Sequence, residues 1–194
     1  MTTLAIIIAS TRPNRVGLPV AQWINAEAVQ HGAIDEVVHI DLLELDLPFM
    51  NEPHHPRLRN YQHQHTKDWR ATVDAADAAD AFVFVMPEYN YGFTAPLKNA
   101  IDYLNHGWQY KPVGLVSYGG VAAGTRAAQM IKQAVTTLKM VPLFEAVSIP
   151  FFQKLLSDDE QLQPNDVMIS AAKAMFDELK RVAEALRPLR QPSQ

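Results

Sequence analysis

A polar segment early in the chain has the side chains that a phosphate group needs. It reads Ser-Thr-Arg-Pro-Asn-Arg-Val-Gly and separates an apolar stretch from a segment with helical spacing. Two hydroxyls and an amide offer hydrogen bonds, and the start of a helix adds free N–H groups and a positive dipole end. Two arginines add charge that favours a terminal dianionic phosphate over a bridging pyrophosphate. The candidate phosphate-binding residues are Ser10, Thr11, Arg12, Asn14, Arg15, Val16 and Gly17.

The letters of this segment argue against two other kinds of phosphate-binding loop. It lacks the glycine triplet with which dinucleotide-binding loops approach a pyrophosphate, and it lacks the Gly-Lys-Ser/Thr ending of nucleotide hydrolases. An ordinary polar turn with two solvated arginines is the alternative. Two charge-assisted contacts and a helix end supply about 4 to 7 kcal/mol, which is less than the ~8 kcal/mol of micromolar binding. A phosphate ligand therefore needs a second surface, one that binds a ring.

Two later loops offer that surface. Residues 87–92 read Pro-Glu-Tyr-Asn-Tyr-Gly; their aromatic rings suit a flat ligand, and the glycine lets the backbone pass close beside it. Residues 117–120 read Ser-Tyr-Gly-Gly, a turn whose amides can point outward. Each segment taken alone also fits an ordinary surface turn. The candidate ring-binding residues are Pro87, Glu88, Tyr89, Asn90, Tyr91, Gly92, Ser117, Tyr118, Gly119 and Gly120.

The elements around these loops predict a doubly wound α/β fold. Stretches rich in β-branched or aromatic residues predict strands at 4–9, 36–42, 81–86, 113–118 and 143–149. Helical spacing predicts helices at 18–31, 66–76, 95–105, 122–139 and 165–186. The first, third and fourth strands are almost continuously apolar, as strands buried on both faces of a parallel sheet must be. We therefore expect a five-stranded parallel sheet in a three-layer α/β/α arrangement, with its ligand at the carboxyl ends of the strands.

Three motifs, each following its own strand, resemble those of the NADPH-dependent FMN reductase family, which includes quinone, azo-dye and chromate reductases. The first is the Ser-Thr-Arg loop at 10–12. The second is the segment at 87–92 with the Pro-Leu-Lys-Asn-Ala-Ile-Asp sequence at 96–102, and the third is the Ser-Tyr-Gly-Gly loop at 117–120. It spans roughly residues 4 to 150. The chain departs from the family pattern at Ala9, where glycine is frequent, and at Arg15, where serine is frequent.

The resemblance implies a flavodoxin-like fold that binds FMN. NADPH or NADH is then the hydride donor, and a ping-pong reaction passes the electrons to a small-molecule acceptor such as a quinone, an azo compound, free flavin or a metal oxyanion. No side chain is assigned as catalytic, because the cofactor carries the chemistry. We expect the amides of Gly119 and Gly120 to face the flavin edge that gathers negative charge on reduction. The resemblance also implies a homodimer or homotetramer built on the helix over 95–105, with Trp108 and Tyr110 suited to the interface.

The amino-acid composition excludes several kinds of site and partner and bears on the expected cellular location. The 194 residues include no Cys, which excludes a disulfide scaffold, a thiolate-bound metal and a catalytic thiol. The net charge of −4 argues against a nucleic-acid partner. The absence of a positive leader and of a membrane-length apolar run argues against export and membrane insertion, so we expect a cytoplasmic protein. One FMN-binding domain is expected over 1–189 and a disordered tail over 190–194.

A long irregular stretch over 47–65 carries four histidines, His54, His55, His63 and His65. No carboxylate or thiolate stands at a ligand-like spacing, so a loop that lines or covers the site is favoured over a metal site. Two alternatives to an enzyme use the same cofactor and fold: a flavodoxin-type electron carrier and a flavin-bearing redox sensor. A phosphorylated receiver domain needs an aspartate at the end of the third strand, where Met86 and Pro87 stand instead.

Overall fold

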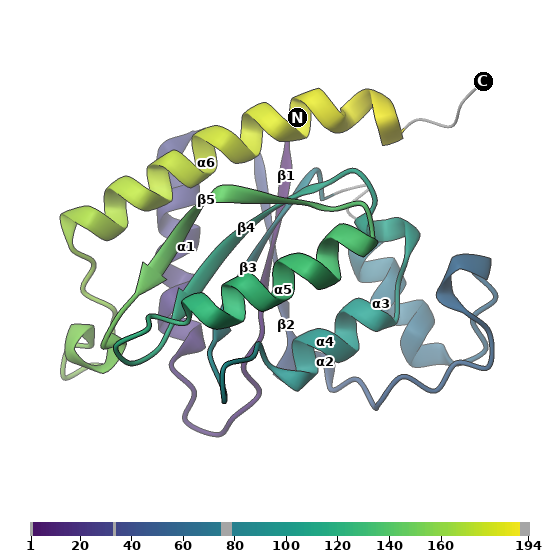
Figure 1. Cartoon of the computed structure of the whole chain (residues 1–194), viewed down its shortest axis with the longest axis horizontal. Coiled ribbons are helices and arrows are strands. Elements are labelled where there is room, and N and C mark those ends of the chain that lie inside the picture. The colour runs from purple at the N-terminus through teal and green to yellow at the C-terminus, as the bar shows by residue number, and fades with distance from the viewer. Residues whose placement is uncertain (1, 33, 75–78, 191–194) are drawn as a thin grey trace.

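Five parallel strands form one sheet in the order β2-β1-β3-β4-β5. The computed structural model describes residues 2–32, 34–74 and 79–190 (Figure 1). The strands are β1 (Thr3–Ile8), β2 (Glu36–Asp41), β3 (Ala81–Pro87), β4 (Pro112–Tyr118) and β5 (Val141–Ile149). This is the flavodoxin-like strand order. From β1 the chain first adds β2 on one side and then crosses over to add β3, β4 and β5 on the other side, so the switch point lies between β1 and β3. The predicted flavodoxin-like α/β fold is confirmed.

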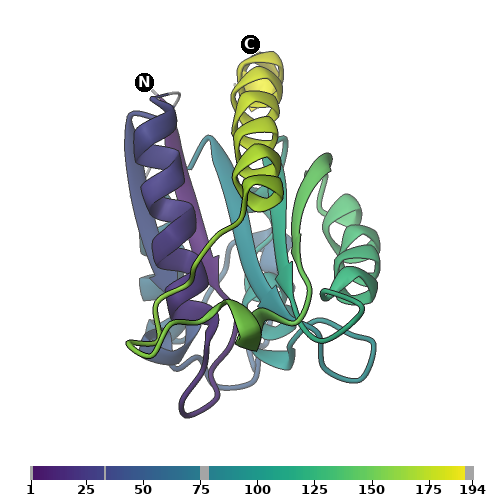
Figure 2. The same cartoon turned by 90° about the vertical axis from the view of Figure 1, so that its left-hand side faces the viewer.

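Two layers of helices enclose the sheet (Figures 1 and 2). One face is covered by α1 (Gly17–His31) and α6 (Asp166–Leu186). The other face is covered by α3 (Gln64–Asp74), α4 (Ala95–Asp102) and α5 (Thr125–Thr137). A short helix, α2 (Leu42–Leu45), follows β2, and 3-10 turns lie at Pro56–Leu58, His106–Trp108, Phe152–Leu155 and Arg187–Arg190.

Alternation along the strands divides the core between the two layers. Leu4, Ile6 and Ile8 of β1 face α1 and α6, whereas Ala5 and Ile7 face the other three helices. Successive side chains of a strand point to opposite faces, so a strand between two helix layers must be apolar throughout. Every residue of β1, β3 and β4 is accordingly buried. No helix among the described residues is long and apolar enough to cross a membrane.

Trp108 belongs to the core and not to an exposed surface. Its side chain is fully buried, its ring centroid lies 5.0 Å from that of Phe82, and its indole Nε1 donates to the carbonyl of Ile101 at 3.1 Å. The expectation that Trp108 suits a subunit interface was therefore wrong. The sequence of the turn at 105–107 is polar and does not indicate that the following tryptophan packs against α4 and β3.

Ordered structure after α6 extends to Arg190, one residue into the tail that was expected to be disordered. Arg190 closes the 3-10 turn after α6, and its guanidinium lies 2.9 Å from the carboxylate of Asp80. The remaining residues of the expected tail, 191–194, lie outside the described residues, as do residues 75 and 76 of the helix expected at 66–76.

The start of α5 depends on a glycine in a left-handed conformation. Ala123 and Gly124 have φ values of 53° and 77°, so the helix begins at Thr125 and not at residue 122 as expected. A Cβ atom on Gly124 would lie 2.9 Å from the Cβ of Ser117 and 3.0 Å from the backbone nitrogen of Tyr118. Both the conformation and the space at this position therefore require glycine.

We expect Gly124→Ala to lower the free energy of unfolding by about 2 to 4 kcal/mol, because it combines left-handed strain with a backbone clash. Urea denaturation followed by circular dichroism measures the change. Gly120→Ala is the matched control, since a Cβ atom there meets nothing within 4 Å. Equal effects of the two substitutions would contradict this account.

Candidate functional site

The loops after β1, β3 and β4 meet at the carboxyl edge of the sheet. The hydroxyls of Ser10 and Tyr89 are 3.2 Å apart, which joins the first loop to the third-strand loop. Buried Thr94 caps α4 and donates its hydroxyl to the carbonyl of Ala9 at 2.9 Å. The segments chosen from the sequence are therefore brought together at the β1/β3 switch point, where ligands of this sheet topology bind.

The first loop leaves the start of α1 open. Val16 is the N-cap residue of α1, and no side chain caps this end of the helix. Asn14 has a φ of 54°, a left-handed conformation that asparagine tolerates and that turns the chain into the helix. Uncapped N–H groups at a helix start are a suitable site for an anion.

The two arginines of this loop have different surroundings. Arg15 binds the Asp41 carboxylate at the end of β2 with both terminal nitrogens, and one of them also donates to the Ser10 carbonyl at 2.8 Å. The Asp41 hydrogen bond raises the pKa of Arg15. Burial alone would raise the pKa of Asp41, but the Arg15 guanidinium holds it below its usual value. Arg12 is exposed and has no ion-pair partner among the described residues, so it is the cation of the loop that a ligand can neutralise.

The third-strand loop is a tight reversal. The N–H groups of Tyr89 and Gly92 each donate to the other residue's carbonyl at 2.9 Å, and Asn90 and Tyr91 have φ values of 50° and 72°. These are the features of a type I′ turn. The turn uses the N–H groups of its two ends, which leaves those of Asn90 and Tyr91 for a ligand. A Cβ atom on Gly92 would lie 3.3 Å from the sulfur of Met130, a tight contact that this exposed, flexible side chain can relieve by a small shift.

An ion pair that was not expected from the sequence holds this turn. The carboxylate of Glu88 accepts from the backbone N–H of Arg126 at 3.1 Å and lies 2.5 Å from a terminal nitrogen of its guanidinium. The guanidinium in turn stacks over the Tyr91 ring, 3.9 Å from its centroid. A cation in the first turn of a helix opposes the helix dipole. The unfavourable place of Arg126 in the first turn of α5 is the feature of the sequence that could have indicated a specific anionic partner.

The fourth-strand loop is bound to the segment after β5. The N–H of Gly119 donates to the Ile149 carbonyl at 3.2 Å, and the N–H of Phe151 donates to the Gly120 carbonyl at 3.2 Å. Ser117 is buried and its hydroxyl donates to the Ala123 carbonyl at 2.9 Å. Of the two amides expected to face the flavin, that of Gly119 is already used within the fold. That of Gly120 has no acceptor in the described parts of the chain.

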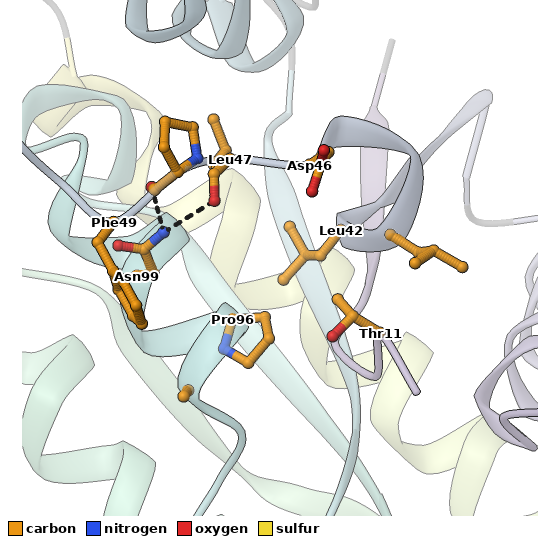
Figure 3. Close-up of a pocket in the computed structure, with 10 residues that line it drawn as sticks. Thr11, Leu42, Asp46, Leu47, Phe49, Pro96 and Asn99 are labelled. Carbon is orange, nitrogen blue, oxygen red and sulfur yellow. Dashed lines mark hydrogen bonds between the residues drawn. The ribbon is translucent and has the colours of Figure 1, made fainter. Parts of the chain in front are cut away.

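A pocket of about 340 Å³ adjoins the first loop on the side of α4 (Figure 3). In this view Thr11 and the exposed ring of Phe49 lie on opposite sides, and Pro96 lies between them. The Asn99 side chain donates to the Pro48 carbonyl at 2.8 Å and accepts from the backbone N–H of Met50 at 2.9 Å. The beginning of the long loop over 47–65 is thereby fastened to α4 and forms one wall of this pocket.

The rest of the long loop is closed by a buried carboxylate. The Glu52 side chain is fully buried and accepts from the N–H groups of Gln62 at 2.7 Å and His63 at 3.0 Å. Burial would raise the pKa of Glu52, but these donors lower it from 4.5 to about 2. Over the described ranges, no three His, Cys, Asp or Glu side chains come together as a set able to hold a metal ion.

These contacts define a flavodoxin-like nucleotide site made of three loops. The chain matches the NADPH-dependent FMN reductase family over residues 2–154 and belongs to that family. An NAD(P)H-dependent FMN reductase of Schizosaccharomyces pombe is 36% identical over 151 residues, 76% of this chain and 73% of that protein. A probable NADPH:quinone oxidoreductase of Oryza sativa is 43% identical over 63 residues, 31% of this chain and 32% of that protein.

A solved structure shows the same fold. FerB, a flavoenzyme NAD(P)H:(acceptor) oxidoreductase from Paracoccus denitrificans, superposes with a TM-score of 0.73 at 18% identity, covering 95% of this chain and 98% of that one. The predicted family is confirmed: the protein is an oxidoreductase with FMN as cofactor and NAD(P)H as co-substrate. The open start of α1 and the unpaired charge of Arg12 fit the phosphate of FMN.

We expect the Glu52 hydrogen bonds to make the free energy of unfolding depend on pH in the acidic range. The pKa of Glu52 is lowered on folding, so its contribution is complete above pH 4.5 and is lost as the pH falls toward 2. Glu52→Gln should be less stable than the parent at neutral pH, because the amide offers fewer acceptors to the two N–H groups. The difference in free energy of unfolding should shrink as the pH falls through this window.

Urea denaturation at a series of pH values tests this expectation. Glu184→Gln, which changes an exposed carboxylate on α6, serves as the control. A difference between Glu52→Gln and the parent that stays constant from neutral pH to pH 2 would mean that Glu52 does not carry the effect.

Proposed function

We propose that FMN lies across the carboxyl ends of β1, β3 and β4, with its phosphate at the start of α1. The observation that supports this most directly is the meeting of the three loops at the switch point, beside a helix start without a side-chain cap. Arg12 and the N–H groups of the first loop would hold the phosphate. FMN held there would supply hydride chemistry, by which electrons from NAD(P)H would reach a small-molecule acceptor in a ping-pong sequence.

The flavin ring would rest beside the turn from Tyr89 to Gly92. The unused N–H groups of Asn90 and Tyr91 would meet its heteroatoms, and the amide of Gly120 would face the edge that becomes negative on reduction. Arg126 and Glu88 keep the turn in place, with the guanidinium on the Tyr91 ring. Every one of these groups binds or orients the cofactor, and none needs to transfer a proton.

The acceptor is proposed to be a quinone, an azo compound, free flavin or a metal oxyanion. The rice relative is named for a quinone, and the pocket beside Thr11 is lined mainly by apolar side chains, which suits an aromatic acceptor. A cytoplasmic location and a homodimer or homotetramer remain predictions.

A flavodoxin-type carrier is the alternative that a direct experiment separates. Protein reconstituted with FMN is mixed anaerobically with NADPH or NADH, and the flavin absorbance is followed by stopped flow. An enzyme of the proposed kind bleaches with the pyridine nucleotide alone and regains its colour when a quinone is added. A carrier stays oxidised until a separate reductase is supplied, and that result would overturn the proposal.

We expect Arg12→Ala to raise the Kd for FMN about tenfold or more, because it removes a charge-assisted hydrogen bond of roughly 1.5–3 kcal/mol. Quenching of flavin fluorescence measures the affinity. The effect should diminish at high salt, since an exposed charge is screened. Arg181→Ala, at an exposed position on α6, is the control for loss of a positive charge. Equal affinities of Arg12→Ala and the parent would exclude Arg12 from the phosphate site.

A further inference from the structure

One buried hydroxyl at the carboxyl edge has no hydrogen-bond partner. Tyr118 ends β4 and is 2% exposed, and its Oη makes no hydrogen bond within the described part of the chain. Leaving a buried hydroxyl unpaired destabilises the folded protein. Buried hydroxyls usually have a hydrogen-bond partner, so this one is available to a polar group outside the chain.

The Tyr118 hydroxyl lies directly beneath the first loop. A Cβ atom on Gly17, the first residue of α1, would come within 2.8 Å of it. Only a glycine at the start of the helix lets the hydroxyl come this close to the loop backbone. The tyrosine ring is held from the other side by Phe152, whose ring packs edge-on with centroids 5.3 Å apart. The hydroxyl is thus placed against the helix start that the phosphate of FMN is proposed to occupy.

The Ser10 hydroxyl lies close enough to lower the pKa of Tyr118, but it makes no hydrogen bond of normal geometry to the Tyr118 hydroxyl. The Ser10 hydroxyl lies at the same place but pairs with the Tyr89 hydroxyl at 3.2 Å. Three hydroxyls therefore gather under the loop, one each from the segments that end β1, β3 and β4. Two of them bind each other, and the third is left over.

The charge around this hydroxyl favours its use as a donor to an anion. Burial raises the pKa of Tyr118 well above its usual value, and the nearby Ser10 hydroxyl and the positive charges of Arg15 and Arg12 offset this only in part. Tyr118 is therefore protonated at neutral pH. Its surroundings contain Arg12, Arg15 paired with Asp41, and an uncapped helix start.

We propose that Tyr118 donates a hydrogen bond to the FMN phosphate from below, and so contributes to the preference for FMN over riboflavin. This inference rests on the proposed placement of FMN. It assigns to the fourth strand a part of the phosphate site, which the first loop alone was expected to form. Removing the hydroxyl should eliminate the cost of a buried unpaired group in the FMN-free protein. It should weaken the binding of FMN and not that of riboflavin.

The test compares Tyr118→Phe with Tyr103→Phe, which removes another buried tyrosine hydroxyl, one that is paired with the Pro48 carbonyl at 2.8 Å. For Tyr118→Phe we expect the Kd for FMN to rise about tenfold and the Kd for riboflavin to change less than about twofold. The melting temperature of the FMN-free variant should equal or exceed that of the parent. Tyr103→Phe should lower the melting temperature and leave both affinities close to those of the parent.

Three results would overturn the inference. Unchanged FMN affinity in Tyr118→Phe would show that the hydroxyl does not touch the cofactor. An equal loss for FMN and riboflavin would place it on the ring or the ribityl chain. A lower melting temperature without FMN, with no selective loss of FMN, would make its role structural. If the parent itself bound no FMN, the proposed placement of the cofactor would fail, and that outcome is distinct from all three.

Discussion

The parallel pairing of β1 with both β2 and β3 determines where a ligand can bind. All of β1 is buried, and its neighbours lie on either side in continuous register. The chain leaves β1 for α1 on one face of the sheet and leaves β3 for α4 on the other. Two loops that depart to opposite faces from adjacent strands leave a crevice between them. Thr94 ties the two sides of this crevice, because its hydroxyl caps α4 and also binds the last carbonyl before the first loop.

Two ion pairs keep the loops around the crevice in shape. Arg15 and Asp41 join the first loop to the end of β2, and Glu88 and Arg126 join the third-strand loop to the start of α5. In each pair the carboxylate is almost buried, with 9% and 7% of its side chain exposed. A buried carboxylate is expensive unless it is paired and hydrogen-bonded, and both carboxylates also accept a backbone N–H. Each pair therefore restrains backbone as well as side chains.

The sequence predicted the strands and the loops well because their signals are local. Continuous apolar stretches identify strands buried on both faces, and the three motifs follow three of those strands. The partners of charged residues were not predictable, because they depend on which strand ends become neighbours. Arg15 and Asp41 are adjacent only since β2 lies beside β1. Trp108 was misjudged for the same reason: its burial depends on the packing of α4 against β3.

Several groups that remain unpaired at the crevice are hydrogen-bond donors. Asp41 and Glu88 are both neutralised by arginines, so neither carboxylate presents free charge to a ligand. What the described loops leave unused is a set of donors: the guanidinium of Arg12, the N–H groups of the turn and of Gly120, and the hydroxyl of Tyr118.

A site rich in donors selects ligands rich in acceptor atoms. A phosphate and the heteroatom edge of a flavin are two such groups within one molecule. The spacing of the two halves of the site is set by the sheet, since β1 and β4 are separated by a single strand. In the proposed placement of FMN, recognition of the whole mononucleotide would follow from strand order, and the individual donors would add selectivity at each end.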